Sequence, residues 1–322
     1  MSLISIASTH DLRAALRQSE DGLGRWGDLR FALNDPASVV LFVCDEAPAS
    51  FATFAPRARR VLVVTEPPEF RAYPARFLAQ FGVILAPFDM EAPGARVIKT
   101  QTGLMWWHGL ALEQGGLRIN SLLADLRALT PAEKSARLSV VCSAKTKLPK
   151  HRARLAFIDR LRARMGERLA LYGGAFAPIA DKAEAITPFQ YHLVLENNDL
   201  DCFWTEKLAD AFLGWSLPFF SGGPGVARDF PEGALAPIDI HDPEGAARVI
   251  LAHMDGGAYE ERLPLIAAAR KRVLEEHNMF ALFARCAADL PPGRLVEPEP
   301  VRQAFPAGLW KTLRRRLVIN AG

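Results

Sequence analysis

The sequence has few of the features that mark disulfide-rich, zinc-binding or membrane-spanning proteins. Its four cysteines lie far apart, and no two of them have the C-x-x-C spacing of a zinc or redox motif. It contains no run of about 18 successive apolar residues, so we expect no transmembrane helix. The amino-terminal segment lacks the basic start of a signal peptide. These absences predict a soluble protein of a reducing compartment, the cytoplasm.

A strong charge of either sign is also missing. The 39 Lys and Arg residues and the 36 Asp and Glu residues leave a net charge of +3. That is too little for the field of the whole chain to attract nucleic acid, and we expect no nucleic-acid partner. Half of the residues are hydrophobic, which excludes a disordered chain. A length of 322 residues suggests about two domains.

Short β-branched runs alternate with helical patterns along the first third of the chain. The runs at 38–43, 60–65 and 82–87 have the composition of strands that are buried on both faces. Residues 69–81 between the last two are enough for a crossover helix. Strand, helix and strand in this order predict a parallel sheet.

A second βα set follows a helical connector at 121–137, where Thr130-Pro131-Ala132-Glu133 has the sequence of a helix start. Two βα halves predict an α/β protein of two Rossmann-like domains, with the ligand at the carboxyl ends of the strands, in the cleft between the halves. We expect strands at 138–143, 168–174, 191–196 and 216–223, helices at 151–165 and 205–214, and mostly helix over 242–290.

The helix expected at 205–214 begins with residues that suit an anion site. Thr205 is a natural N-cap, and the free N–H groups and dipole of the helix start favour negative charge. Lys207 adds a fixed positive charge, and Glu206 can accept hydrogen bonds from sugar hydroxyls. A stable helix cap alone is the alternative interpretation of these residues.

Polar and glycine residues end the strands on either side of this helix. Glu196 and Asn197 follow the strand before it. Gly222 and Gly223 follow the strand after it, where missing side chains let a ligand approach the backbone closely. The order of these residues along the chain points to a nucleotide site at the ends of the strands.

The whole pattern resembles the donor-binding signature of the α-1,3/4-fucosyltransferases, glycosyltransferase family 10, in their bacterial form. The resemblance extends over about 150–245 and includes Glu196-Asn197, Phe203-Trp204-Thr205-Glu206-Lys207-Leu208, Ala211, Pro218 and Gly222-Gly223-Pro224. It implies a GT-B fold, in which two Rossmann-like domains face each other across a cleft. It also implies an inverting transfer of fucose from GDP-fucose to an oligosaccharide hydroxyl, on an N-acetylglucosamine or glucose unit of a surface glycan.

The resemblance also implies roles for single residues. Arg154 and Lys207 match the residues that bind the donor diphosphate, and Glu206 matches the glutamate that contacts the nucleotide sugar. Leu195 and Trp204 depart from the usual pattern, which leaves a GT-B enzyme for another nucleotide sugar open. The other donor-binding matches are Glu196, Asn197, Phe203, Thr205, Gly222 and Gly223.

Independent chemistry supports a site that binds a diphosphate without a resident metal. An Arg fork and a Lys ammonium can together stabilise the charge of the leaving diphosphate. We therefore expect no tightly bound metal, and stimulation by Mn²⁺ or Mg²⁺ stays open. Asp199-Leu200-Asp201 has the form of a DxD metal motif but lies in a loop that varies within the family. A solvated basic face is the alternative interpretation of Arg154.

An inverting transfer needs a carboxylate that takes the proton of the acceptor hydroxyl. Glu66 follows the run at 60–65 and precedes two prolines, so it is expected at a strand end. The family places a glutamate in a similar context, and Glu66 is our candidate base. Asp45 and Glu46, after another expected strand, are the alternatives, and a solvated strand-end carboxylate is the structural interpretation.

These assignments divide the chain into three parts. We expect an acceptor-binding domain at 1–125, a donor domain at 126–300 and a basic amphipathic tail at 301–322. Trp310 and Leu317 share a face of that tail. The tail is expected either on an anionic membrane surface, where glycolipid or lipopolysaccharide acceptors occur, or packed on the first domain. The first option makes the protein peripheral to the inner membrane. A non-catalytic nucleotide- or glycan-binding protein stays the alternative from another class.

Overall fold

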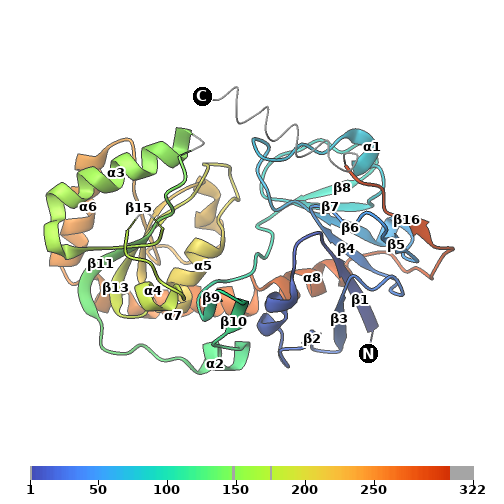
Figure 1. Cartoon of the computed structure of the whole chain (residues 1–322), viewed down its shortest axis with the longest axis horizontal. Helices are drawn as coiled ribbons and strands as arrows, with labels where there is room; N and C mark the ends of the chain where they lie inside the picture. The colour runs from blue at the N-terminus through green and yellow to red at the C-terminus, as the bar shows by residue number, and fades with distance from the viewer. Residues whose placement is uncertain (1, 147–148, 175, 305–322) are drawn as a thin grey trace. The chain divides into compact units, whose positions relative to one another are not determined.

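The computed structural model describes residues 2–146, 149–174 and 176–304, which form two compact α/β units (Figure 1). The first unit is Met1–Met105 with His277–Gly322, and the second is Trp106–Glu276. The predicted boundaries at 125 and 300 differ from this division, because 106–125 group with the second unit and 277–300 with the first. The expected amphipathic face at Trp310–Leu317 lies outside the described residues. Among the described helices, none is long and apolar enough to cross a membrane.

The first unit is built on a seven-stranded sheet with the order β2-β3-β1-β4-β6-β7-β8. All neighbours are parallel except β2 and β3, which are antiparallel. The strands are β1 Ser2–Ala7, β2 Arg25–Trp26, β3 Leu29–Leu33, β4 Leu41–Cys44, β6 Arg60–Val63, β7 Val83–Ala86 and β8 Arg96–Lys99, with β5 Ala52–Thr53 and β16 Glu299–Pro300 in a separate antiparallel pair.

The three strands expected in the first third are confirmed as β4, β6 and β7, but the crossover helix between the last two is much shorter than 69–81. Only α1 (Ala75–Leu78) is helical. Pro74 stands directly before it and has no N–H for a helical hydrogen bond. The helix therefore begins only after the last proline of this segment.

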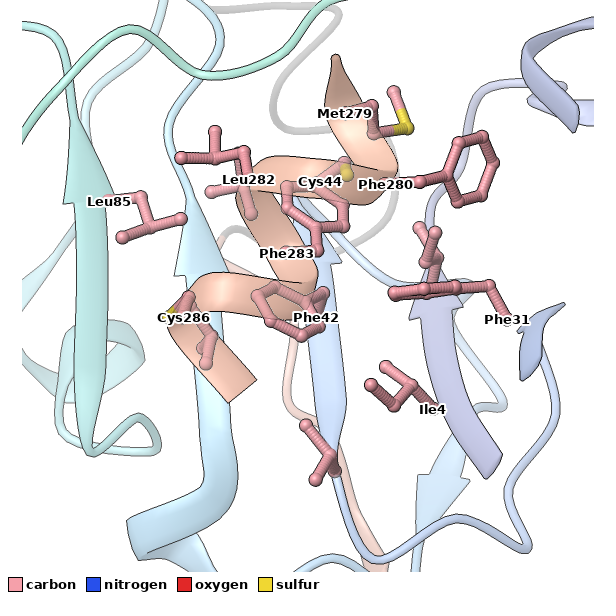
Figure 2. Packing of buried hydrophobic residues seen from close by; sticks show 14 of the residues in the cluster. Ile4, Phe31, Phe42, Cys44, Leu85, Met279, Phe280, Leu282, Phe283 and Cys286 are labelled. Carbon is pink, nitrogen blue, oxygen red and sulfur yellow. The ribbon is translucent and has the colours of Figure 1, made fainter. Parts of the chain in front are cut away.

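A helix from the carboxyl-terminal part of the chain completes the core of the first unit. In Figure 2, α8 (Met279–Ala288) lies against the strands that carry Phe31 and Phe42. The Phe283 ring stacks on Phe42 with ring centroids 4.4 Å apart, and the Phe280 ring meets Phe31 edge-on at 5.2 Å. These buried aromatic contacts hold 277–300 in the first unit, although the sequence pattern is that of a continuous helical region.

The second unit is built on a five-stranded parallel sheet with the order β12-β11-β13-β14-β15. Its strands are β11 Ser135–Val141, β12 Leu169–Tyr172, β13 Phe189–Leu195, β14 Leu217–Ser221 and β15 Ala236–Pro237, and a separate hairpin pairs β9 Leu110–Glu113 with β10 Gly116–Ile119. The four strands expected in this half are confirmed as β11 to β14. The predicted pair of Rossmann-like units is thus present.

Helices cover both faces of this sheet. Figure 1 shows α3 and α6 on one side and α4, α5 and α7 on the other. Right-handed crossovers that run in opposite directions along the sheet place their helices on opposite faces. The helices are α2 Leu123–Ala128, α3 Pro149–Met165, α4 Ala183–Ile186, α5 Glu206–Leu213, α6 Pro243–Asp255 and α7 Ala258–Glu275.

The helix start predicted at Thr130-Pro131-Ala132-Glu133 is wrong. The α2 helix ends at Ala128 and no helix follows before β11. Lys134, at the entrance to β11, donates to the carbonyl oxygens of Gly214 at 2.8 Å and Phe189 at 3.3 Å. These tertiary contacts bind the segment to the sheet, so they outweigh the local capping signal.

Candidate functional site

The order of strands in the second unit places its site at the carboxyl end of the sheet. The first strand, β11, has β12 on one side and β13 on the other, so the connections after β11 and β13 leave in opposite directions. Ligands of doubly wound sheets bind at such a reversal. The loop after β13 and the amino-terminal end of α5 lie there, and they contain Glu196 and 205–207.

Glu196 is the centre of a buried hydrogen-bond cluster at the end of β13. Its side chain is inaccessible to solvent. It accepts from the Thr205 backbone N–H at 2.8 Å, from the Thr205 hydroxyl at 2.8 Å and from Lys207 Nζ at 3.1 Å. Thr205 caps α5 as predicted, because its hydroxyl accepts from the Lys207 N–H. The structure therefore brings three of the predicted residues together.

Alternating charges continue from Lys207 along the first turns of α5. Glu206 lies 3.6 Å from Lys207 Nζ and 3.4 Å from Lys182 Nζ, and Lys182 also pairs with the buried Asp210 at 2.8 Å. Burial disfavours the charged form of Glu206, but Lys207 and Lys182 outweigh it and hold the pKa of Glu206 at about 2. The pKa of Lys207 is raised against burial by Glu196 and Glu206. Glu206 and Lys207 therefore stay charged at neutral pH.

Arg154 projects from α3 to the same strand end. It is buried, and its Nη1 donates to the Leu195 carbonyl at 3.2 Å and to Asn197 Oδ1 at 2.5 Å. Within the described chain, its Nε has no hydrogen-bond acceptor. The exposed basic face that was the alternative interpretation of Arg154 is wrong, because the guanidinium is enclosed beside β13.

The pKa of the His151 ring is affected by these cations. Burial lowers its pKa first, and Arg154, Lys145 and Lys207 lower it further, to about 4. Cations from three segments, the loop after β11, α3 and α5, therefore disfavour protonation of this ring. The side chains of Arg154 and Lys207 both reach the end of β13, where they are suited to bind an anion.

The glycines after β14 make room for the chain itself. A Cβ built on Gly223 would lie 1.8 Å from the Leu200 carbonyl oxygen and 2.7 Å from that of Asp201. Only glycine allows the loop after β13 to approach β14 so closely. Gly222 lies between the Phe220 ring and Glu196, at 2.4 Å and 3.1 Å from its built Cβ.

The aromatic residues before α5 are buried in the second unit. Phe203 is 7% exposed, and its N–H donates to the Leu200 carbonyl. Trp204 donates from Nε1 to Asp229 at 2.6 Å and packs on the Phe230 ring. Both residues thus fix the loop that leads into α5.

The carboxylates of the DxD-like sequence face different cations. Asp199 pairs with Lys150, and Asp201 pairs with Arg228 at 2.8 Å. Across the described ranges, no group of three or more His, Cys, Asp and Glu side chains is arranged to hold a metal ion. His192 on β13 is buried and bonded to the Ser139 hydroxyl at 2.8 Å, and burial lowers its pKa to about 3.

In the first unit, the candidate bases lie on the segments after β4 and β6. Asp45 is buried with a positive φ of 57° and accepts from the Thr65 N–H at 2.8 Å, from the Thr65 hydroxyl and from the Tyr73 hydroxyl. Glu46 pairs with Arg71 at 2.6 Å. Glu66 is exposed and follows directly after Thr65. Of the three acids, Asp45 is buried, Glu46 is half-buried and Glu66 is exposed.

Sequence reasoning missed Lys182 and Asp210. Asp210 stands four residues after Glu206 on α5, so the two carboxylates share a helix face. That spacing was a usable signal for Asp210. Lys182 lies in a different segment, and no local pattern relates it to α5.

Comparisons with known proteins give one short sequence match and several distant structural ones. No family profile matches the chain. A segment of 64 residues is 30% identical to the alpha-(1,3)-fucosyltransferase FucT of Helicobacter pylori, and it covers 20% of this chain and 13% of that relative. The crystal structure of an alpha1,3-fucosyltransferase with GDP-fucose is 18% identical over 87% of this chain and 93% of the other, with a TM-score of 0.46.

The fold itself has a structural counterpart over most of the chain. A structure of trehalose-6-phosphate from E. coli bound with UDP-2-fluoro glucose is 10% identical over 91% of this chain and all of the other, with a TM-score of 0.51. At this identity the likeness concerns the fold alone. It confirms the GT-B class of two Rossmann-like domains.

Proposed function

We propose that the chain is an inverting glycosyltransferase that moves fucose from GDP-fucose to a hydroxyl of an oligosaccharide. The observation that carries the proposal is the position of two cations at the switch point of the second sheet: Arg154 donates to the Leu195 carbonyl at 3.2 Å, and Lys207 Nζ lies 3.1 Å from Glu196. An arginine and a lysine at this point of a doubly wound sheet suit the binding of a nucleoside diphosphate. The resemblance in the 191–225 sequence and the short match to the Helicobacter pylori enzyme support fucose as the sugar.

In the proposed reaction, Arg154 and Lys207 stabilise the diphosphate that leaves. Negative charge grows on the diphosphate oxygens as the bond to the sugar breaks, and a guanidinium and an ammonium nearby lower the energy of that transition state. Both cations are held by buried partners, so they need little reorganisation. The donor-binding set also includes Glu196, Asn197, Phe203, Thr205, Glu206, Gly222 and Gly223.

Glu66 is the proposed base. Its carboxylate takes the proton of the acceptor hydroxyl while the oxygen forms the new bond to the sugar, and GDP departs with the electron pair of the broken bond. We propose no resident metal, because the two cations can supply the charge stabilisation.

The proposed acceptor is a surface glycan or glycolipid, such as lipopolysaccharide. An enzyme of the cytoplasmic side would meet it at the inner membrane. The basic sequence of 309–319 suits an anionic lipid surface, and nucleic acid is not a proposed partner.

A thermal-shift panel of nucleotides and nucleotide sugars tests the donor. A ligand that binds only the folded state raises the unfolding midpoint by mass action. We expect GDP and GDP-fucose to raise it, and UDP or CMP compounds to have little effect. A shift with UDP-sugars alone would assign the site to another donor. A shift with GDP-fucose but no transfer to any acceptor glycan would favour a non-catalytic binding protein.

A further inference from the structure

The second unit contains an apolar pocket of about 710 Å³ at the carboxyl ends of β14 and β15. Its walls include the buried rings of Phe220 and Phe230 together with Leu235 and Ile238. This volume is within the ~300–1,000 Å³ of pockets that bind small organic ligands. Among the described residues that line it, only Glu232 carries a charge.

The pocket adjoins the charged cluster at the end of β13. Gly222 lines the pocket, and a Cβ built on it would lie 2.4 Å from the Phe220 ring and 3.1 Å from Cγ of Glu196. One glycine therefore separates the apolar wall from the carboxylate that holds Lys207. A molecule with its charged end at Lys207 can place an uncharged, planar end in the pocket.

We propose that this pocket receives the base of the donor nucleotide and that Glu232 selects guanine. The inference rests on the proposed function, because it requires a nucleoside diphosphate at Arg154 and Lys207. Proteins bind single bases between aromatic or apolar side chains and read the Watson–Crick edge with hydrogen bonds. Phe220, Phe230 and Leu235 provide such apolar surface.

The carboxylate of Glu232 accounts for the choice of base. A carboxylate only accepts hydrogen bonds. Guanine presents two adjacent donors, N1–H and the N2 amino group, which match its two oxygens. Adenine and cytosine have a ring-nitrogen acceptor beside their amino group, and uracil has one N–H between two carbonyls, so each of these would set an acceptor against the carboxylate. In the described chain, Glu232 is exposed at the rim and forms no ion pair or hydrogen bond of its own.

Calorimetric titration of GDP, IDP, ADP and UDP into the full-length protein tests the pocket. IDP is GDP without the N2 amino group, so it isolates one of the two donors. We expect GDP to bind about tenfold or more tightly than the other three, as a charge-assisted hydrogen bond allows. Glu232→Gln should weaken GDP binding about tenfold and leave ADP binding unchanged. It should also reduce the difference in affinity between GDP and IDP. Ala227 is exposed and lines the pocket, so Ala227→Trp should weaken GDP binding because the indole ring fills the pocket.

Glu261→Gln, an exposed glutamate on α7, is the matched control and should behave as wild type. If wild type binds GDP and neither Glu232→Gln nor Ala227→Trp changes its affinity, the pocket assignment is overturned while the proposed function stands. Equal affinity of wild type for GDP and IDP, or tighter binding of UDP or ADP, would overturn the role of Glu232 in selecting guanine. If none of the four nucleotides binds, the proposed function fails and the base subsite with it.

Discussion

The buried carboxylates near the carboxyl ends of the two sheets have different partners. In the second unit, Glu196 and Asp210 are inaccessible to solvent and each lies within 3.1 Å of a lysine Nζ. In the first unit, the buried Asp45 accepts hydrogen bonds from Thr65 and Tyr73, which are neutral. Burial and the charge of Asp45 raise the pKa of the Tyr73 hydroxyl, so it remains a donor.

In the proposed function, this difference would separate two tasks. Paired charges in a low-dielectric site keep cations at fixed positions, which suits the stabilisation of a leaving diphosphate. The hydrogen bonds from Thr65 and Tyr73 to Asp45 instead hold the turn that leads to Glu66. The Glu66 carboxylate itself is exposed. A base that exchanges protons with an acceptor and with water benefits from such exposure.

The largest expected effect comes from the exposed carboxylate of the first unit. Glu66→Gln should reduce the transfer rate about 10²–10⁴-fold, as loss of a general base does, and leave the affinity for GDP unchanged. Initial rates of fucose transfer and calorimetric GDP binding measure the two quantities. Glu69→Gln, an exposed neighbour, is the control. Full activity in Glu66→Gln would assign the base elsewhere.

Lys182 should contribute mainly to stability. Lys182→Met leaves Asp210 buried without its cation, and we expect a loss on the order of 2–4 kcal/mol in the free energy of unfolding. Urea unfolding measures it, with Lys271→Met at an exposed position of α7 as control. The double variant Lys182→Met/Asp210→Asn should recover part of the loss. A double variant as unstable as the sum of both changes would show that the pair does not interact.

Lys207 should contribute to ligand affinity. Lys207→Ala removes a cation that we place on the diphosphate, so GDP binding should weaken about 10–100-fold, the range of a charge-assisted hydrogen bond. Calorimetry measures it, and Lys271→Ala serves as the control. Unchanged GDP affinity would remove Lys207 from the proposed site.

The smallest effect is a dependence of stability on pH. His151 and His192 have pKa values of about 4 and about 3 in the fold, against about 6.5 when unfolded. Between these values the unfolded chain binds more protons, so the free energy of unfolding should fall as the pH falls from about 6.5 to 4.5. Glu206 has a pKa of about 2, so it lowers the free energy of unfolding further only below about pH 4.5. Urea unfolding at several pH values measures the slope, and a flat profile in the upper window would contradict neutral, buried histidines.

Much of the second unit could be predicted because its signals are local. The apolar runs that became β11 to β14 end in polar or glycine residues and alternate with helical patterns, and Thr205 has the sequence of the cap that it forms. The first unit was predicted less completely. The strands β1, β3 and β8 were not identified, because polar residues such as Ser5 in β1 and Arg30 in β3 interrupt their apolar runs and Arg96 and Lys99 end β8.

The sequence by itself determined two βα units, the start of α5 and the residues around Glu196 that meet there. These features follow from side-chain periodicity and from capping, which act over a few residues. Only the tertiary structure decided that α8 completes the first unit, that Lys182 joins Glu206 to Asp210, and that the glycines after β14 make room for the chain at Leu200. Each of these depends on packing between distant segments, where the free energy comes from burial and from charges brought together by the fold.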